Sequence, residues 1–235
     1  MIGTIINFFA VILGSLLGLS FGKVFSQRAR NTIIAGLGLF TVAIGLKMFF
    51  ETQNELIVLG GLLMGGLLGE WLKIETHLSR LGESLEKRFS REAEGDKEGR
   101  SRFVRGFLTA SLLFCVGPMA ILGSMQDGLE GDFRLLMIKS VLDGFASFAF
   151  ASTLGWGVIF AAPIVFLYQG GITLLAAQIK VFLSEAMITE MSATGGVILV
   201  GLAISSFLEI KPIRAANFLP GLVISPVIVA LLTAL

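Results

Sequence analysis

Charged residues are scarce in this chain of 235 residues: only 15% are Asp, Glu, Lys or Arg, whereas 54% are apolar. A soluble domain keeps about a quarter of its residues charged to cover its surface. The small share of charge and the mean hydropathy of +0.87 therefore exclude an ordinary soluble domain and predict a surface that mostly faces lipid. The formal net charge of +1 gives no reason to expect a nucleic-acid partner.

Cysteine and histidine are scarcer still, with one of each. Cys115 lies in an apolar run, so no disulfide can form within the chain, and we expect a buried, inert thiol. Because His77 has no second histidine and no cysteine nearby, we expect neither a metal site nor a cofactor. The chain also contains no HExxH motif. Its GLEGD stretch falls short of a GxGD motif, because Leu129 stands where that motif has its first glycine. We therefore do not expect an enzyme.

Basic residues are missing before the first apolar run, MIGTIINFFAVILGSLLGLSFGK, which also has no cleavage signal of small residues. This pattern favours a retained membrane helix over a removable signal peptide. A spanning helix needs about 20 apolar residues, and on this criterion the chain predicts about eight of them. The candidate ranges are 2–21, 32–50, 56–73, 103–124, 134–154, 156–179, 193–209 and 215–234. We therefore expect an all-α, polytopic membrane protein that forms one integral membrane domain over residues 1–235.

Basic residues alternate between the connections of this topology. Lys and Arg gather in the first, third and seventh connections, and the even connections are poorer in them. Because basic loops stay in the cytoplasm, both termini are predicted to lie outside. In the third connection, residues 71–91 carry apolar side chains at helical spacing between charges, which predicts an amphipathic helix along the cytoplasmic interface. Residues 92–101 are expected to form a solvated loop, so that 71–102 is a cytoplasmic helix and loop.

An internal repeat is indicated by an offset of 160 residues, which places 32–63 over 192–223 without gaps. The matched pairs are Gly36 and Gly196, Leu39 and Leu199, Ala43 and Ala203, Ile44 and Ile204, Leu59 and Leu219, Gly61 and Gly221, and Leu62 and Leu222. The second and seventh spans run in opposite directions in the predicted topology, so the repeat would be inverted. Inverted repeats are typical of secondary transporters.

The strongest polar cluster lies in the fifth span, where Lys139, Ser140, Asp143, Gly144 and Ser147 share one helical stripe. An ionisable group at bilayer depth costs a few kcal/mol unless something offsets it, and it marks a candidate functional site. Lys139 and Asp143 are one turn apart and can pair. This pair is either a structural salt bridge or a site for a charged substrate or coupling ion, with Lys139 releasing Asp143 when that ligand binds.

Further polar side chains are expected to converge on this cluster or to bond between helices. Gly170 and Gly171 permit a break in the sixth span, and two prolines and a glycine predict a discontinuous last helix. Asp127 is either a site residue or an ordinary loop residue, and Asn7 and Asn217 are either ligand contacts or helix–helix hydrogen bonds. The additional candidates are Tyr168, Gln169 and Thr173 in the sixth span, Gln126 and Asp127 after the fourth, Asn217 in the last, and Asn7 in the first.

Four stretches resemble a known family: VGPMAILGSMQDGL (116–129), KSVLDGFASFAFASTLGWGV (139–158), YQGGITLLA (168–176) and NFLPGL (217–222). The chain is similar along its whole length to the YqgA- and YdfK-like bacterial inner-membrane proteins, the domain of unknown function 554 group. The resemblance implies a bacterial inner-membrane location and a multi-helix fold. It implies no substrate.

On the basis of these polar residues, we expect a secondary transporter of a small solute or ion with a midplane site around Lys139 and Asp143. The alternatives are a passive channel and a membrane scaffold or sensor that docks through the basic connection. Expected partners are the lipid bilayer and the small solute or ion. Glycine faces at Gly14, Gly18 and Gly22 and at Gly61, Gly65 and Gly69 allow close packing and a homodimer.

Overall fold

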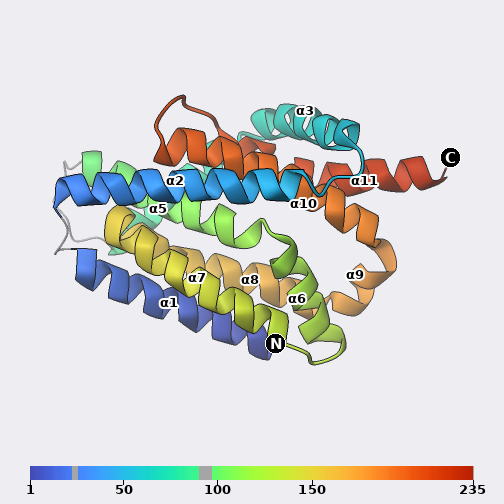
Figure 1. Ribbon diagram of the computed structural model, residues 1–235, viewed down its shortest axis with the longest axis horizontal. Helices are drawn as coiled ribbons and strands as arrows, with labels where there is room; N and C mark the ends of the chain where they lie inside the picture. Colours follow the sequence, from blue (N-terminus) through green and yellow to red (C-terminus); the bar gives the residue numbers. More distant parts are fainter. Residues whose placement is uncertain (23–25, 90–96, 235) are drawn as a thin grey trace. The chain divides into compact units, whose positions relative to one another are not determined.

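The computed structural model describes residues 1–22, 26–89 and 97–234, and the regular structure within these ranges is entirely helical (Figure 1). The elements are α1 (Ile2–Gly22), α2 (Gln27–Phe49), α3 (Glu55–Trp71), α4 (Ile74–Phe89), α5 (Lys97–Cys115), α6 (Pro118–Leu129), α7 (Arg134–Leu154), η1 (Gly155–Phe160), α8 (Ala161–Leu174), α9 (Ala176–Phe182), α10 (Glu185–Leu202), η2 (Ala203–Phe207), η3 (Ala215–Phe218) and α11 (Gly221–Ala234).

Five helical stretches of the described residues are long and apolar enough to cross a membrane, or seven if two bent pairs each count as one span. The bent pairs are α3 with α4 and α5 with α6, each with a 57° bend. The helical membrane class is thus confirmed, and the number of eight crossings stays a prediction. The amphipathic helix expected at 71–91 is present as α4, whereas residues 97–101, expected in a loop, belong to α5. The rest of that expected loop, residues 92–96, lies outside the described residues.

The contacts within the chain form two compact units. Unit 1 comprises residues 1–34, 78–115 and 119–177, and unit 2 comprises residues 35–77, 116–118 and 178–235. The single domain expected from the sequence therefore contains two separate groups of contacts, and each is described by itself.

Unit 1 is built around close contact between α1 and α7. A Cβ atom at Gly14 would lie 2.1 Å from the carbonyl oxygen of Gly144, and one at Gly18 would lie 2.2 Å from that of Phe148. Residue numbers rise together along both helices, so α1 and α7 are parallel. Helix α8 packs against α1 in the opposite direction, because Phe8 contacts Phe166 and Thr4 contacts Thr173. The chain therefore reverses direction between α7 and α8, next to Gly155 with its φ of 80°.

Replacing Gly14 by alanine tests this helix contact. The new methyl group would overlap the Gly144 carbonyl, and overpacking of this kind costs about 1–3 kcal/mol. Gly171→Ala is the matched control, because a Cβ atom there meets nothing within 4 Å, and alanine favours a helix over glycine by about 0.5–1 kcal/mol. Thermal unfolding in detergent should show a lower midpoint for Gly14→Ala and an unchanged or higher one for Gly171→Ala. Equal midpoints would contradict the contact.

Unit 2 holds the helices of the predicted repeat. A Cβ atom at Gly61 would lie 2.0 Å from Ser225 Oγ, and one at Gly65 would lie 2.3 Å from the Gly221 nitrogen. The offset of 160 residues aligns Gly61 with Gly221 and Gly65 with Ser225. The contact of Gly61 with Ser225 and the contact of Gly65 with Gly221 therefore fall at equivalent positions of the predicted repeat. Residue numbers fall along α11 as they rise along α3, so these two helices are antiparallel.

Helices α2 and α10, the other pair in the repeat, are also antiparallel within unit 2. A Cβ atom at Gly45 would lie 2.5 Å from the Gly196 carbonyl oxygen, and one at Gly38 would lie 2.8 Å from Phe207 Cβ. Residue numbers thus fall along α10 and η2 as they rise along α2. The opposite directions that the sequence predicted for these two helices are confirmed.

Two predicted helix breaks have different outcomes. The last span is discontinuous, as expected, since η3 ends at Phe218 and α11 begins at Gly221. The break expected at Gly170 and Gly171 is wrong, because α8 continues to Leu174 and a new helix begins at Ala176. A Cβ atom at Gly170 would lie 3.2 Å from Met1 Cε, the end of a flexible side chain.

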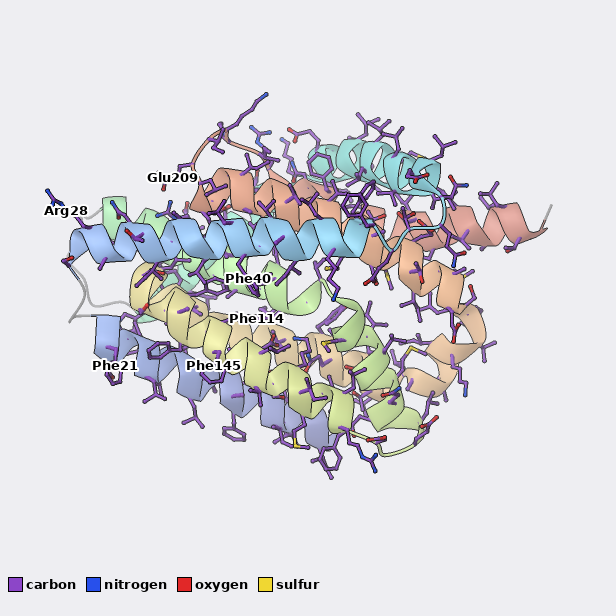
Figure 2. The ribbon with its side chains drawn as sticks, in the orientation of Figure 1. Phe21, Arg28, Phe40, Phe114, Phe145 and Glu209 are labelled. Carbon is purple, nitrogen blue, oxygen red and sulfur yellow. The ribbon has the colours of Figure 1, made fainter. Side chains whose placement is uncertain are left out.

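Large apolar side chains are exposed on both units. Figure 2 shows Phe21 and Phe145 at the surface of unit 1, where they are 53% and 73% exposed, while Phe114 lies inside at 1%. This pattern is the one expected where lipid replaces water as the solvent. By contrast, Gly14 and Gly18 of α1 face α7, and Gly61, Gly65 and Gly69 of α3 face α11 and η3 of the same chain. These faces are thus occupied, so the homodimer stays a prediction without support from them.

Candidate functional site

The candidate site is centred on two ionised side chains of α7 in unit 1. Lys139 and Asp143 are only 5% and 7% exposed, and their side chains form the ion pair that the spacing of four residues predicts. The Lys139 ammonium also lies 5.8 Å from the centre of the Phe114 ring on α5. The pair reduces the cost of holding both charges away from water, although such pairs rarely stabilise a protein relative to apolar residues.

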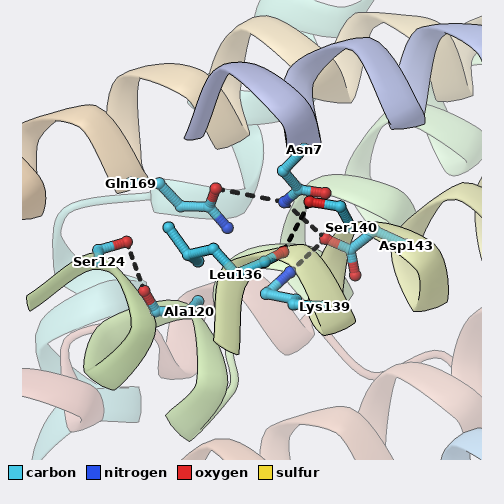
Figure 3. Close-up of polar contacts among 8 residues, drawn as sticks. All are labelled: Asn7, Ala120, Ser124, Leu136, Lys139, Ser140, Asp143 and Gln169. Atoms are coloured by element: carbon cyan, nitrogen blue, oxygen red, sulfur yellow. Dashed lines mark hydrogen bonds and ion pairs between the residues drawn. The ribbon is translucent and has the colours of Figure 1, made fainter. Parts of the chain in front are cut away.

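Asn7 of α1 connects this ion pair to α8 (Figure 3). Its amide nitrogen donates to Asp143 Oδ2 at 2.9 Å and to Gln169 Oε1 at 3.2 Å. A carboxylate only accepts hydrogen bonds, so the nitrogen of Asn7 must face Asp143. The oxygen of Gln169 must in turn face Asn7. The orientation of both amides is therefore determined by the charge of Asp143.

Three polar atoms around the pair keep unused hydrogen-bonding capacity. Asn7 Oδ1, Gln169 Nε2 and Ser147 Oγ are buried and have no hydrogen-bond partner among the described residues. One is an acceptor, one is a donor and the hydroxyl is both. Buried polar atoms are normally paired, so a group of unpaired ones beside a charge indicates a place where a ligand, ion or water binds.

Between Asn7 and the N-terminus of α1, the polar side chains are hydrogen-bonded to other groups of the chain. Thr4 and Thr173 share a hydrogen bond of 3.4 Å, one turn of α1 from Asn7. Asp127, which the sequence left as site or loop residue, is buried and accepts from the Gly3 amide at 3.1 Å and from the Met1 amine at 2.9 Å. It therefore binds the start of α1. The sequence prediction missed Thr4, although its position three residues before Asn7 places both on one helical face.

The remaining predicted residues of unit 1 have other surroundings. The Ser140 hydroxyl donates to the Leu136 carbonyl oxygen of its own helix, so its proton is not available to a ligand (Figure 3). Thr173 is buried and Tyr168 half-buried on α8, and no hydrogen bond of the Tyr168 hydroxyl is part of this network. Gln126 is exposed on α6. Asn7, Lys139, Asp143 and Gln169 are thus brought into contact, and Gln126 is not.

Asn217 lies in unit 2, where it belongs to a different network. Its side-chain oxygen accepts from the Glu75 amide at 2.8 Å, and its amide nitrogen donates to Glu70 Oε2 at 2.6 Å. Glu70 also pairs with Arg214. Of the two roles left open by the sequence, Asn217 makes hydrogen bonds between helices, and its side-chain oxygen caps a free backbone amide at the start of α4.

Glu190 is a buried polar residue that sequence reasoning placed in a connection. It lies on α10, is 2% exposed, and accepts from Thr52 Oγ1, from the Gln53 amide at 2.8 Å and from the Asn54 amide at 3.3 Å. These bonds hold the loop between α2 and α3. Apolar residues on both sides of Glu190, Met187 and Ile188 before it and Met191 after it, were the signal that it belonged to a helix.

Glu190→Gln tests this anchor. The amide keeps the shape but loses the charge that strengthens three hydrogen bonds, and bonds to charged groups contribute about 1.5–3 kcal/mol. We expect a clearly lower thermal midpoint in detergent. The control, Glu185→Gln, changes an exposed residue in the first turn of the same helix, where the charge contributes about 0.3–1 kcal/mol through the helix dipole. Equal effects would show that the loop does not depend on Glu190.

No group of three or more metal-binding side chains occurs in the described parts of the chain. Residues 18–22 read GLSFG and match the spacing of a GxSxG serine-hydrolase motif. That motif needs an exposed serine on a strand-to-helix turn. Here Ser20 lies inside α1 and donates to the Leu16 carbonyl oxygen, so the match carries no chemistry.

Comparisons with known proteins agree on one family. The family described as "Protein of unknown function (DUF554)" matches residues 2–230. The chain is 31% identical over 238 residues to the "Uncharacterized membrane protein YdfK" of Bacillus subtilis (strain 168), covering 100% of this chain and 98% of the relative. It is 29% identical over 235 residues to the "Uncharacterized protein YqgA" of Escherichia coli (strain K12), covering 99% and 98%. No solved structure matches.

Proposed function

Because the chain belongs to the DUF554 family and is a helical membrane protein, we propose that it is a secondary transporter whose site is the polar network around Asp143. The observation that carries the proposal is the set of unpaired polar atoms on Asn7, Gln169 and Ser147 beside a buried ion pair. A purely structural salt bridge has no use for unsatisfied donors and acceptors around it, because each costs about 1–3 kcal/mol.

Charge balance suggests how such a site works. Lys139 and Asp143 neutralise each other, so an ion that binds to one of them must displace the other. A small cation, the proton included, would take the place of the ammonium at Asp143 and could use Asn7 Oδ1 as a further oxygen ligand. An amphoteric solute would bind both charges at once. In either case Lys139 is released when the ligand arrives and returns when it leaves.

The arrangement of the helices supports the same proposal. In unit 2, α2 and α3 lie antiparallel to α10 and α11 at an offset of 160 residues. In unit 1, the same offset places residues 2–14 of α1 over α8, and α1 and α8 are also antiparallel. Inverted repeats of this kind are common in secondary transporters, whose sites lie near the bilayer midplane. The proposal further assigns the protein to a bacterial inner membrane, with both termini outside.

Flux in reconstituted vesicles tests the proposal. Purified protein in liposomes with a trapped pH-sensitive dye is given gradients of Na⁺, K⁺ or Li⁺, and of a panel of amphoteric metabolites labelled with isotopes. We expect saturable uptake of one solute that protein-free vesicles do not show. Non-saturating flux would favour a channel. If no solute moves and one stoichiometric partner binds through residues 75–100, the protein is a scaffold or sensor instead.

A further inference from the structure

The Lys139 ammonium can donate three hydrogen bonds, but only one oxygen in the described part of the chain accepts from it. That oxygen is Asp143 Oδ2, which also accepts from Asn7 (Figure 3). The Lys139 side chain is 6% exposed, so it has little access to water. The other group against the ammonium, within the same described ranges, is the Phe114 ring, whose centre lies 5.8 Å away.

The Phe114 ring is held in this position by its surroundings. It lies near the end of α5, is 1% exposed, and stacks on Phe150 of α7 with ring centres 6.2 Å apart and planes inclined by 28°. The face of an aromatic ring carries partial negative charge. A cation within about 6 Å of the ring centre is attracted to that face, and more strongly where both are shielded from water. The ring is therefore a fixed second partner for the ammonium.

An aromatic ring differs from a second carboxylate in its effect on the charge of the site. Lys139 and Asp143 neutralise each other, so a further carboxylate would leave an uncompensated negative charge shielded from water. A ring face attracts the ammonium without adding net charge, and it attracts a cation less strongly than a carboxylate does. The ammonium thus prefers Asp143 while that carboxylate is free and keeps a weaker partner when it is not.

We propose that Phe114 provides the second binding position of the Lys139 ammonium, which the side chain occupies when a small monovalent cation takes its place at Asp143. The role of the bound cation rests on the proposed function, whereas the attraction between ring and ammonium does not. Since the ammonium already lies over the ring, a shift of the Lys139 side chain suffices for the exchange. The cation-bound site carries one net positive charge, which the ring face partly offsets. Phe114 is thus a positioning residue that acts on cation affinity through Lys139.

Fluorination of Phe114 tests this attraction with little change in packing. Fluorine atoms withdraw electrons from the face of the ring and weaken its attraction for a cation, while the ring keeps nearly the same size. Phenylalanine or its monofluoro, difluoro or trifluoro form is introduced at position 114 by suppression of a stop codon, and thermal unfolding of the purified protein is measured in detergent. We expect three fluorines to lower the midpoint by a total of about 2–4 °C.

Three backgrounds distinguish a second binding position from a packing effect. The variant Lys139→Met/Asp143→Leu has no ammonium, so its fluorination slope is the packing baseline. The wild type should have a steeper slope than this baseline. In Asp143→Asn the ammonium loses its carboxylate and depends more on the ring, so the slope should be steeper again. A slope in Asp143→Asn no greater than in the wild type, or a wild-type slope equal to the baseline, would overturn the proposal.

Phe107 provides the matched control ring. It lies two turns before Phe114 on α5, is also 1% exposed, and has no cation over its ring among the described residues. Fluorine at this position acts through packing alone, so we expect the same slope in all three backgrounds. Slopes at Phe107 that differ between backgrounds as those at Phe114 do would count against the assignment of the effect to Phe114.

Flux with gradients of Na⁺, K⁺ or Li⁺ separates this inference from the proposed function. Trifluorination of Phe114 should raise the cation concentration for half-maximal uptake by about fivefold, because the displaced ammonium loses attraction of about 1 kcal/mol, and should change the maximal rate less. An unchanged concentration for half-maximal uptake would overturn the role of Phe114 in cation affinity. The expected midpoints without any cation uptake would support the second position of the ammonium and remove the transport proposal.

Discussion

Asp143→Asn is expected to reduce solute flux in liposomes to the level of protein-free vesicles. Asparagine has nearly the same shape as aspartate, so the helix contacts remain, but the only carboxylate of the network is lost. Loss of one partner of a buried, hydrogen-bonded charge pair costs about 2–5 kcal/mol. Applied to the bound or transition state of transport, this is a loss of about thirtyfold or more in rate.

Ser140→Ala is the matched control for this prediction. Ser140 lies on the same stripe of α7 and was predicted as a site residue, but its hydroxyl is bonded to its own helix. Its removal should leave flux within about twofold of the wild type, since a surplus helix hydroxyl contributes little. If both variants transport at the wild-type rate, Asp143 has no part in the mechanism and its pair with Lys139 is structural.

Lys139→Met is expected to cause a large loss of stability. Methionine fills a similar volume, but it leaves the Asp143 carboxylate buried without its cation, which costs about 3–5 kcal/mol. The double variant Lys139→Met/Asp143→Leu removes both charges, and an apolar pair of similar volume is often as stable as the ion pair. Thermal unfolding in detergent should show a low midpoint for the single variant and recovery in the double variant.

This double-mutant comparison separates the two contributions of the pair. Recovery with loss of transport would show that the ion pair is retained for function, because stability does not require it. A double variant that is as unstable as Lys139→Met would contradict the account, since the cost would then come from packing around Phe114 rather than from an isolated charge.

The sequence predicts the centre of the site because that part depends on a single helix. Lys139, Asp143 and Ser147 are four residues apart, and helical periodicity alone places them on one stripe. The contact of Asp143 with Asn7 joins residues 136 positions apart. It requires parallel packing of α1 and α7 through Gly14 and Gly18, and nothing local in the sequence specifies which helices pack together.

The failures have physical causes of the same kind. Gly170 was interpreted as a helix breaker, but glycines are also tolerated inside membrane-spanning helices, and helix packing rather than the local sequence decides whether a helix breaks there. Glu190 was placed in a connection because charges mark loops in membrane proteins. Its carboxylate is buried because backbone amides of a distant loop satisfy it, and a count of apolar residues does not detect that compensation.

The central claim is that the network around Asp143 binds the transported solute, and ligand-dependent stability tests it most directly. A ligand that binds only the folded protein stabilises it by about 2.7 kcal/mol at a concentration of 100 times Kd. Thermal unfolding of the purified wild type and of Asp143→Asn should be measured with each solute of the flux panel. We predict that the transported solute raises the midpoint of the wild type and leaves that of Asp143→Asn unchanged. An equal rise in both proteins would show that the solute binds elsewhere and would contradict the account.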